Sequence, residues 1–461
     1  MLEKIFDIFY EISKKLPSIK NPERQLTSKE KLQWTLIILA LYFILFNTTA
    51  IGLKEHRFEQ DFIQIITASR QGSLLALGIG PIVIAGIVIQ LFAGSGILNF
   101  DFMKIETRKK VAGATTTFAI IIAIFEAVIV STNYANIGLF TIEVNQLTLL
   151  FVALQIALGA IAVIYMDQIV TKYGIGSGIS LFIAAGVSYG IVTGFLFTLF
   201  SERGVISTVS QEGLEGLTNA FIMLLPFFST LFLFWLVLKG ESAKIVLPLS
   251  IPGINRSLEL PFFFVSNLPV VFASAFLVYV FLLSQALLTT PSENIGWQHY
   301  LGAILYLFTP ISAGGNIPAY IAFLTQGKTP VFELPEWLHA ITYVIALCVL
   351  SIFFGKFWVE INPQQNPENL ANALISAGIQ LRGFRNDPRL IKNRLSEYVW
   401  PLTVTGSLAV GLLAGIGDLL AVYGTGTGIL LTVGILYRLS TEIKNTLDIY
   451  YPSISKFIFK E

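Results

Sequence analysis

The chain has 461 residues, of which 54% are hydrophobic and only 13% are charged. Soluble domains usually carry about 25% charged residues, so this composition excludes an ordinary soluble protein and predicts a helical protein that crosses a membrane many times. The formal net charge of +1 gives no reason to expect a polyanionic partner. The single cysteine, Cys348, excludes internal disulfides and a cysteine-based metal site, and we expect it to be an ordinary packing residue.

The apolar segments predict ten membrane spans. Residues 1–31 form a basic, amphipathic segment before the first span, and its apolar side chains are typical of an interfacial helix: Ile5, Phe6, Ile8 and Phe9. The first half, residues 32–200, is expected to hold spans at about 32–50, 58–94, 111–130, 147–170 and 177–199. A polar hinge linker, 201–217, leads to the second half, 218–442, with spans at about 217–238, 262–288, 338–357, 399–416 and 426–439. A tail follows at 443–461.

Lysine and arginine gather at the N-terminus, after the second, sixth and eighth spans, and at the C-terminus. Short loops rich in these residues stay in the cytoplasm, so both termini are expected there, which an even number of spans allows. The loops at about 239–260 and 358–397 are cytoplasmic on this argument, and β-favouring residues in the first of them indicate a hairpin. The apolar stretch 299–311 is too short to cross and is expected to dip into the membrane edge.

The second span differs from the others. The stretch LGIGPIVIAGIVIQLFAGSG at 77–96 carries no charge, contains Pro81 near its start, and runs apolar only from Ile82 to Ala93, which is shorter than the run of about 20 apolar residues that a crossing needs. The preceding residues, 58–70, are too polar to face lipid. Broken crossings are tolerated only where they are buried in protein or line a cavity. The sequence therefore predicts that this span lines a pore.

Two short motifs occur twice in the chain. GPIV at 80–83 and LPVV at 268–271 begin the second and seventh spans, and GIGSGI at 174–179 and GTGTGI at 424–429 begin the fifth and tenth. Because each half has an odd number of spans, the two halves would have opposite orientations. Inverted repeats with broken helices place a functional path at the centre of the bilayer, between the halves.

Aliphatic residues stand beside these glycine-rich motifs. Ile79 and Val83 are four residues apart, so they are expected to share one helix face, and Ile175 and Ile179 repeat this spacing. One interpretation is a ring of aliphatic side chains that closes a narrow pore by dewetting. The alternative is ordinary core or lipid-facing packing, which periodicity alone favours.

Intramembrane acidic residues are few: Glu126 lies in the third predicted span, Asp167 near the end of the fourth, and Asp418 just before the tenth. An ion-coupled carrier usually places several acidic groups at mid-membrane, where each costs about 2.5 to 3.5 kcal/mol, and only Glu126 is a candidate. The sequence contains no nucleotide-binding, zinc-protease or serine-triad motif, and no cofactor or metal site is expected. The histidines are expected at membrane interfaces: His56, His299 and His339. A secondary transporter with inverted repeats stays an alternative, whereas an intramembrane enzyme would lack catalytic residues.

Several stretches resemble the SecY family, the channel subunits of the Sec protein translocase. They are ITASR at 66–70, LGIGPIV at 77–83, QLFAGSG at 90–96, YGIGSGISLFIAAGVS at 173–188, VSNLPVV at 265–271, LRGFR at 381–385 and GTGTGILLTVGILYR at 424–438. The resemblance covers about residues 20–445 and is most similar to the archaeal and eukaryotic branch. It implies an all-α polytopic membrane protein, with ten transmembrane helices in two inverted, pseudo-symmetric five-helix halves around a central pore.

The resemblance also implies roles for particular residues. A pore ring falls on Ile79, Val83, Ile175, Ile179, Val271 and Leu431. A plug at about residues 58–70 includes Phe62, Ile65 and Ile66. A lateral gate between the second and seventh spans would use Gln90 and Tyr279, the latter where relatives often have asparagine. The cytoplasmic loops would bind a ribosome or another partner through Lys244, Arg256, Arg382 and Arg385.

The implied function is a passive protein-conducting channel in the plasma membrane, which moves unfolded secretory polypeptides across and releases transmembrane segments sideways into lipid. Expected partners are a SecE-type subunit, a small single-span beta-type subunit, the ribosome, nascent polypeptides with their signal sequences, and membrane lipid. No small-molecule substrate is expected. Because the sequence shows no nucleotide site, the energy for movement must come from the ribosome or another driver.

Overall fold

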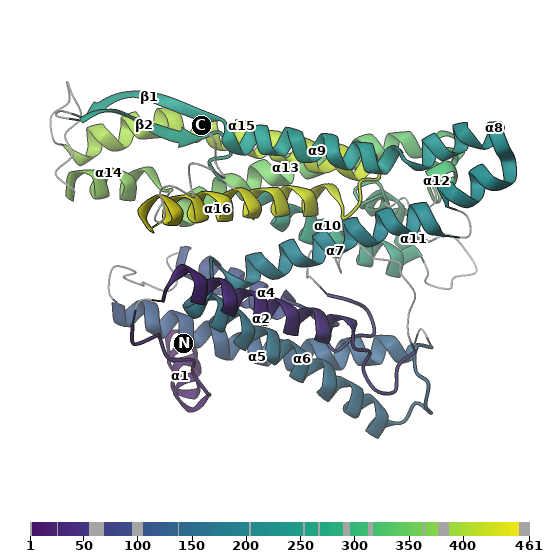
Figure 1. Cartoon of the computed structure of the whole chain (residues 1–461), viewed down its shortest axis with the longest axis horizontal. Helices are drawn as coiled ribbons and strands as arrows, with labels where there is room; N and C mark the ends of the chain where they lie inside the picture. Colours follow the sequence, from purple (N-terminus) through teal and green to yellow (C-terminus); the bar gives the residue numbers. More distant parts are fainter. Residues whose placement is uncertain are drawn as a thin grey trace. The chain divides into compact units, whose positions relative to one another are not determined.

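The structure is a computed structural model that describes residues 2–24, 26–54, 69–94, 105–136, 138–201, 204–251, 254–265, 268–288, 296–311, 317–362, 365–376 and 387–450. The regular structure of these residues is helical apart from one two-stranded hairpin (Figure 1). The chain divides into two compact units. The first contains residues up to Ser188 together with those from Ile435 onward, and the second contains Tyr189–Gly434.

The first unit is built from α1 (Leu2–Lys15), α2 (Ser28–Asn47), α4 (Gly80–Gly94), α5 (Ile105–Asn136), α6 (Gln146–Tyr173) and the start of α7 (Gly178–Phe200). In this unit α5 packs on α6, α1 and α4 pack on α5, and α2 packs on α6. The described part of α4 has 15 residues, or about 22 Å, and reaches the end of the described range at Gly94. That the second span is too short to cross a bilayer core stays a prediction.

The N-terminal helix α1 forms as predicted, and its aromatic residues pack on the protein. Phe6 is buried in a cluster with Ile89 of α4, and the ring of Phe9 stacks on Phe118 of α5 with 5.7 Å between the ring centroids. Ile8, in contrast, is 56% exposed. The predicted apolar face therefore divides between contacts with α4 and α5 and an exposed side.

The turn before α4 lies directly on α6. A Cβ atom added to Gly159 of α6 would lie only 1.9 Å from the carbonyl oxygen of Leu74. The same turn is tied to the end of α2, because the N–H of Leu74 donates to the carbonyl of Thr48 at 2.9 Å. These contacts determine where α4 begins, and they require the absence of a side chain at residue 159.

The second unit contains α8 (Val205–Met223), α9 (Leu225–Ser242), β1 (Lys244–Ile251), β2 (Ile254–Pro261), α10 (Leu268–Leu288), α11 (Trp297–Tyr306), α12 (Ile317–Gln326), α13 (Glu336–Ile361), α14 (Pro367–Ser376) and α15 (Pro388–Leu419), with the end of α7 and the start of α16 (Gly426–Tyr450). The predicted hairpin is confirmed, because β1 and β2 pair antiparallel. The helix α8 extends through most of the residues that the sequence indicated as a polar linker.

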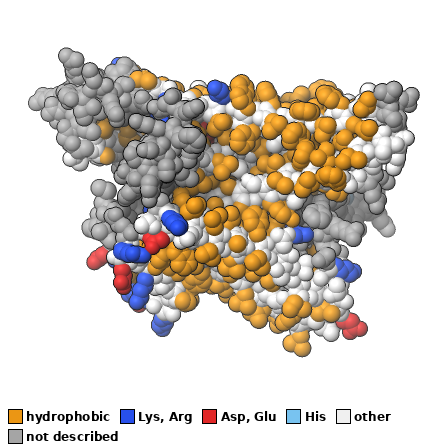
Figure 2. Space-filling model, viewed as in Figure 1, with side chains coloured by type: hydrophobic (Ala, Val, Ile, Leu, Met, Phe, Trp, Pro, Cys, Tyr) orange, Lys and Arg blue, Asp and Glu red, His pale blue; other side chains and the backbone are white. Residues whose placement is uncertain are grey.

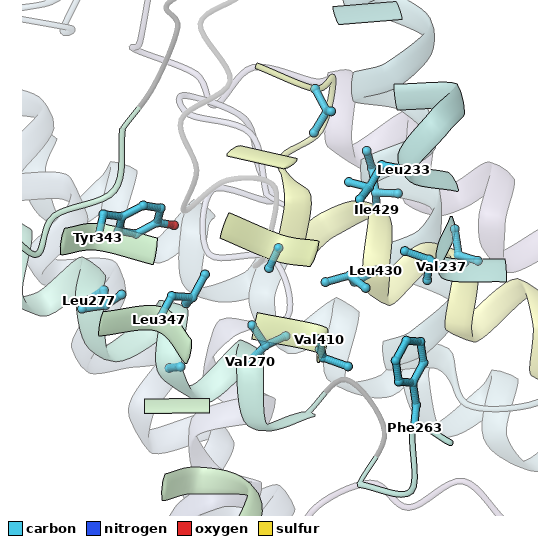
Figure 3. Packing of buried hydrophobic residues seen from close by; sticks show 14 residues of the cluster. Leu233, Val237, Phe263, Val270, Leu277, Tyr343, Leu347, Val410, Ile429 and Leu430 are labelled. Atoms are coloured by element: carbon cyan, nitrogen blue, oxygen red, sulfur yellow. The ribbon is translucent and has the colours of Figure 1, made fainter. Parts of the chain in front are cut away.

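The main core of the second unit is an apolar cluster where α9, α10, α13, α15 and α16 meet (Figure 3). It contains Leu233, Val237, Phe263, Val270, Ala273, Leu277, Tyr343, Leu347, Val410, Ala414, Val422, Ile429, Leu430 and Val433. Glycines allow α15 to approach α13 closely, since a Cβ at Gly411 would lie 3.1 Å from the Cα of Cys348. Cys348 is buried, as expected for a packing residue.

A second cluster supports the charged end of α15. With 32 residues α15 is about 48 Å long, well beyond a bilayer core of about 30 Å. Its first turns carry Arg389, Lys392 and Arg394, and its apolar side chains there pack against α14, the end of α13 and the end of the hairpin. We infer that this end of α15 lies outside the hydrocarbon region.

Seven segments of the described chain are long and apolar enough to cross a membrane: Lys29–Asn47, Lys109–Asn136, Gln146–Tyr173, Gly178–Gln211, Gly216–Ser242, Glu336–Glu360 and Pro388–Leu419. They match predicted spans one, three, four, five, six, eight and nine, and α4, α10 and α16 lie at the other three positions. Hydrophobic side chains cover much of the helix surface in view (Figure 2). The total of ten spans stays a prediction.

A buried polar cluster holds the start of α13. The Nδ1 of His339 lies 2.9 Å from Oε2 of Glu336, and its Nε2 donates to the carbonyl of Thr309 at 3.0 Å. The hydroxyl of Tyr306 donates to Oε1 of Glu336 at 3.3 Å. Burial, assisted by the nearby Glu336, raises the pKa of Tyr306 to about 12, so the phenol keeps its proton. His339 is thus buried within the protein, and its position at a membrane interface stays a prediction.

We expect Gly159→Ala to destabilise the fold by about 2 kcal/mol, because the new methyl group would overlap the carbonyl of Leu74 and force the turn away from α6. Thermal unfolding in detergent measures the loss. Gly86→Ala is the matched control, since nothing lies within 4 Å of a Cβ at that position. Equal melting temperatures for the two variants would contradict the close contact.

We expect His339→Phe to cost about 3 kcal/mol, because it leaves the buried Glu336 and the Thr309 carbonyl without their partner. The double variant His339→Phe with Glu336→Met also removes the buried carboxylate and should recover part of the loss, because only the Thr309 carbonyl and the Tyr306 hydroxyl then lack their partners. Denaturation of both variants in the same detergent is the measurement. If the double variant is no more stable than the single one, the contact between His339 and Glu336 does not carry the effect.

Candidate functional site

The first pair of predicted ring residues lies at the start of α4. Ile79 stands directly before the helix and is only 1% exposed. The N–H of Val83 donates to the carbonyl of Ile79 at 3.1 Å, which is the bond of an α-helical turn. The prediction that Ile79 and Val83 share one face is therefore confirmed.

The prediction that Ile175 and Ile179 share a helix face is wrong. The helix α7 begins only at Gly178, so Ile175 lies before it. Between them Gly176 has a φ of +73°, a left-handed conformation that glycine adopts without strain. This turn breaks the helical spacing between the two residues. Both isoleucines are half-buried.

The other ring residues lie in the second unit. Val271 in the first turn of α10 and Leu431 in α16 are 8% and 7% exposed. Gln90 lies in α4 and Tyr279 in α10, as the lateral gate would require. Since the two units are described separately, the meeting of the six ring residues and of the gate helices stays a prediction.

The remaining predicted site residues fall on the plug and the loops. The plug residues Phe62, Ile65 and Ile66 and the loop arginines Arg382 and Arg385 lie outside the described residues. Of the hairpin residues, Lys244 is exposed at the start of β1, and Arg256 lies in β2.

The start of α7 is held by two acceptors from neighbouring helices of the first unit. Asp167, near the end of α6, accepts the N–H of Ile179 with Oδ1 at 2.8 Å. The hydroxyl of Thr35, on α2, accepts the N–H of Ile175 at 3.0 Å. A Cβ at Gly178 would lie 2.6 Å from the Cα of Asp167, so the helix start can approach α6 this closely only with glycine at residue 178.

The start of α16 is held in the same way within the second unit. Asp418, near the end of α15, accepts the N–H of Gly426 with Oδ1 at 2.7 Å, while its Oδ2 accepts the hydroxyl of Tyr343 at 2.7 Å. The hydroxyl of Thr230, on α9, accepts the N–H of Tyr423 at 3.0 Å. A Cβ at Gly426 would lie 2.0 Å from the carbonyl oxygen of Ala414 in α15.

These bonds define how the two glycine-rich motifs correspond. Ile175 and Tyr423 each donate to a threonine, and each is followed by a glycine of positive φ, +73° at Gly176 and +79° at Gly424. Two residues later each helix begins. The structural correspondence therefore differs by two residues from the match of 174–179 with 424–429 that the sequence indicated.

The sequence indicates Asp167 and Asp418 only as charges inside the membrane, and nothing in its pattern singles out Thr35 or Thr230. One signal was present, because each aspartate precedes the amide that it accepts by only 12 and 8 residues, and an acid is favourable at a helix N-terminus. Both carboxylates are bonded to backbone, whereas Glu126 lies half-buried on α5. Among the described residues no three His, Cys, Asp or Glu side chains gather as metal ligands.

Comparison with known proteins gives a consistent result. A family model described as SecY matches residues 73–440. The protein translocase subunit SecY of Methanococcus vannielii is 37% identical over 451 residues, which covers 96% of this chain and 98% of that protein. Identity at this level over nearly the full length of both chains establishes the family.

Solved structures show the same similarity. One described as "The structure of a protein conducting channel" has a TM-score of 0.72 and 34% identity, and it covers 96% of this chain and 99% of that chain. Another, "Sec61 in the Canine ribosome-channel complex from the endoplasmic reticulum", has a TM-score of 0.70 at 34% identity with the same coverage. The chain is a multi-pass membrane protein and a non-enzymatic, protein-conducting channel, and it belongs to the SecY family of protein translocase subunits.

Proposed function

We propose that this chain forms its pore between two inverted halves, with a constriction lined by Ile79, Val83, Ile175, Ile179, Val271 and Leu431. The observation that carries the proposal is the repeated construction at α7 and α16, where an aspartate and a threonine hold the backbone just before and at the helix start. Such a repetition is what a duplicated half would produce. It supports the view that α7 and α16 have equivalent places beside one path.

The chemistry of the six side chains suits a constriction that excludes ions and still lets a polypeptide pass. Each is an uncharged branched aliphatic residue, so a narrow opening between them excludes water and the ions that need it. The same side chains offer no hydrogen bonds to an extended polypeptide, so a threaded chain would be held only weakly. The plug at about 58–70, with Phe62, Ile65 and Ile66, would close the path further at rest.

Lateral release needs only a seam that opens toward lipid. A signal sequence has an apolar core of about 7 to 15 residues. At about 0.3 to 0.6 kcal/mol per residue, such a segment favours lipid by several kcal/mol, and one central Arg or Lys opposes this by about 2.5 to 3.5 kcal/mol. We place the seam between α4 and α10, at Gln90 and Tyr279. Partition through it would sort segments without a chemical step.

A docking surface on the cytoplasmic side is the second part of the proposal. The charged start of α15, the helix α14 and the end of the hairpin pack on one apolar cluster, and the loops 239–260 and 358–397 belong to this region. The canine relative is described in a ribosome–channel complex. We therefore propose that Lys244, Arg256, Arg382 and Arg385 contact the ribosome, whose phosphates attract basic side chains.

The remaining assignments follow the charge distribution and the family. The gathering of Lys and Arg at both ends of the chain and in the long loops favours cytoplasmic termini. Archaeal relatives as similar as 37% identity favour the plasma membrane as the location. SecE-type and small beta-type subunits are the expected companions in the membrane, with nascent polypeptides as the transported cargo.

Replacing Ile79 and Ile179 together with Asn should raise the ion leak of the resting channel about tenfold, the factor that corresponds to 1.4 kcal/mol, because amide groups would hydrate the constriction. Ion flux from vesicles containing the channel is the measurement. Ile79→Val with Ile179→Val keeps the ring apolar and is the matched control. Unchanged flux in the Asn variant would count against the constriction.

Reversing Arg385 to Glu should weaken ribosome binding about tenfold, since one charge-assisted contact contributes about 1.5 kcal/mol. Co-sedimentation of detergent-solubilised channel with ribosomes measures the change. Lys328→Glu makes the same charge reversal in a linker that we expect on the opposite side of the membrane, and it should bind as well as the parent. Equal weakening by both reversals would remove the specific role of the loop.

A further inference from the structure

We propose that Asp167 and Asp418 are positioning residues of the constriction, each fixing the start of a helix that carries ring side chains. The inference rests on the proposed function, because it concerns how the ring is held in place. Neither carboxylate is part of the ring itself. Each acts through the backbone amide that it accepts, from the end of the preceding membrane helix.

In the first unit the bonds reach the ring residues directly. The N–H of Ile179 donates to Asp167, and the N–H of Ile175 donates to Thr35. The left-handed turn at Gly176 lies between them. The two isoleucines therefore do not belong to one helix, and no helix fixes the position of one relative to the other. The positions of their side chains therefore depend on the two acceptors, one on α6 and one on α2.

In the second unit the hydrogen bond to the aspartate lies about one helical turn before the ring residue, Leu431. Asp418 accepts the N–H of Gly426, and Leu431 follows five residues later on the same helix, at a rise of about 1.5 Å per residue. Asp418 is itself held by the hydroxyl of Tyr343 from α13. The height and rotation of Leu431 are thus fixed by a helix start that is bound to α15, with α13 as a second support.

A carboxylate is suited to this place for two physical reasons. The first amides of a helix have no partner within the helix, and in a bilayer water does not replace it. The positive end of the helix dipole also favours a negative group at the N-terminus, which offsets the cost of a charge inside the membrane. Gly178 and Gly426 allow the approach, because a side chain at either residue would overlap the preceding helix.

The test is the ion leak of vesicles that contain the full-length chain with the subunits that copurify with it. We expect Asp167→Ala to raise the resting ion leak about fivefold. This factor corresponds to the loss of about 1 kcal/mol of stabilisation at the helix start. Asp167→Asn keeps an oxygen that can accept the N–H of Ile179 and should restore the parental leak. Asp418→Ala should leak like Asp167→Ala.

The matched control is Ser131→Ala, which removes another buried hydrogen bond of the first unit, from Ser131 of α5 to the carbonyl of Leu149 in α6. It is expected to lower the melting temperature without raising the leak. Thr35→Val is a second test variant that preserves side-chain volume and removes the acceptor for Ile175. It should leak even if the aspartate variants do not accumulate in folded form.

The outcomes separate this inference from the proposed function. If the Asn variants of Ile79 and Ile179 leak while Asp167→Ala and Thr35→Val do not, the positioning role is overturned and the constriction stands. If Ser131→Ala leaks as much as Asp167→Ala, the leak reflects general destabilisation, and the positioning role is likewise overturned. If neither the ring nor the positioning variants leak, the constriction itself is refuted.

Discussion

The hydrogen bond from a helix-start amide to a side chain of a neighbouring helix is the interaction on which the proposed channel depends. Inside a bilayer an amide without a partner is costly, so a helix that begins there needs an acceptor from the protein. Asp167 and Asp418 provide it for α7 and α16. Because the acceptors lie on α6 and α15, the same bonds that satisfy the backbone also set the spacing between adjacent helices.

Close backbone contacts complete this arrangement. Lipid is as apolar as leucine, so helices in a membrane associate mainly through tight packing, for which small residues are needed. Gly159 brings the turn before α4 onto α6, Gly178 brings α7 onto α6, and Gly426 brings α16 onto α15. Gly178 and Gly426 stand at the starts of α7 and α16, and Gly159 stands within α6 against the turn that precedes α4. These glycines are therefore needed for close contact between backbones, and not only for the conformational freedom of the chain.

Composition and local pattern were enough to predict most of the helices and the hairpin, because each of these depends on neighbouring residues. The register of the repeat was misread because both motifs have glycine at every second residue, and the in-line match of 174–179 with 424–429 has more identities than the structural match, which is shifted by two residues. The shared face of Ile175 and Ile179 failed because the left-handed turn at Gly176 interrupts the helix. The partners of Asp167 and Asp418 depend on helix packing that spacing alone does not give.

The length of α15 has a mechanical consequence. The charged end of this helix packs on the apolar cluster that it shares with α14 and the hairpin, and the other end carries Asp418. A single helix of 32 residues is stiff along its axis, and Pro401 is the point within it where the backbone ladder loses a bond and bending is easiest. A load applied at the proposed docking end would thus be carried along a helix that bends most easily at Pro401. The other end of that helix carries Asp418, whose carboxylate holds the start of α16.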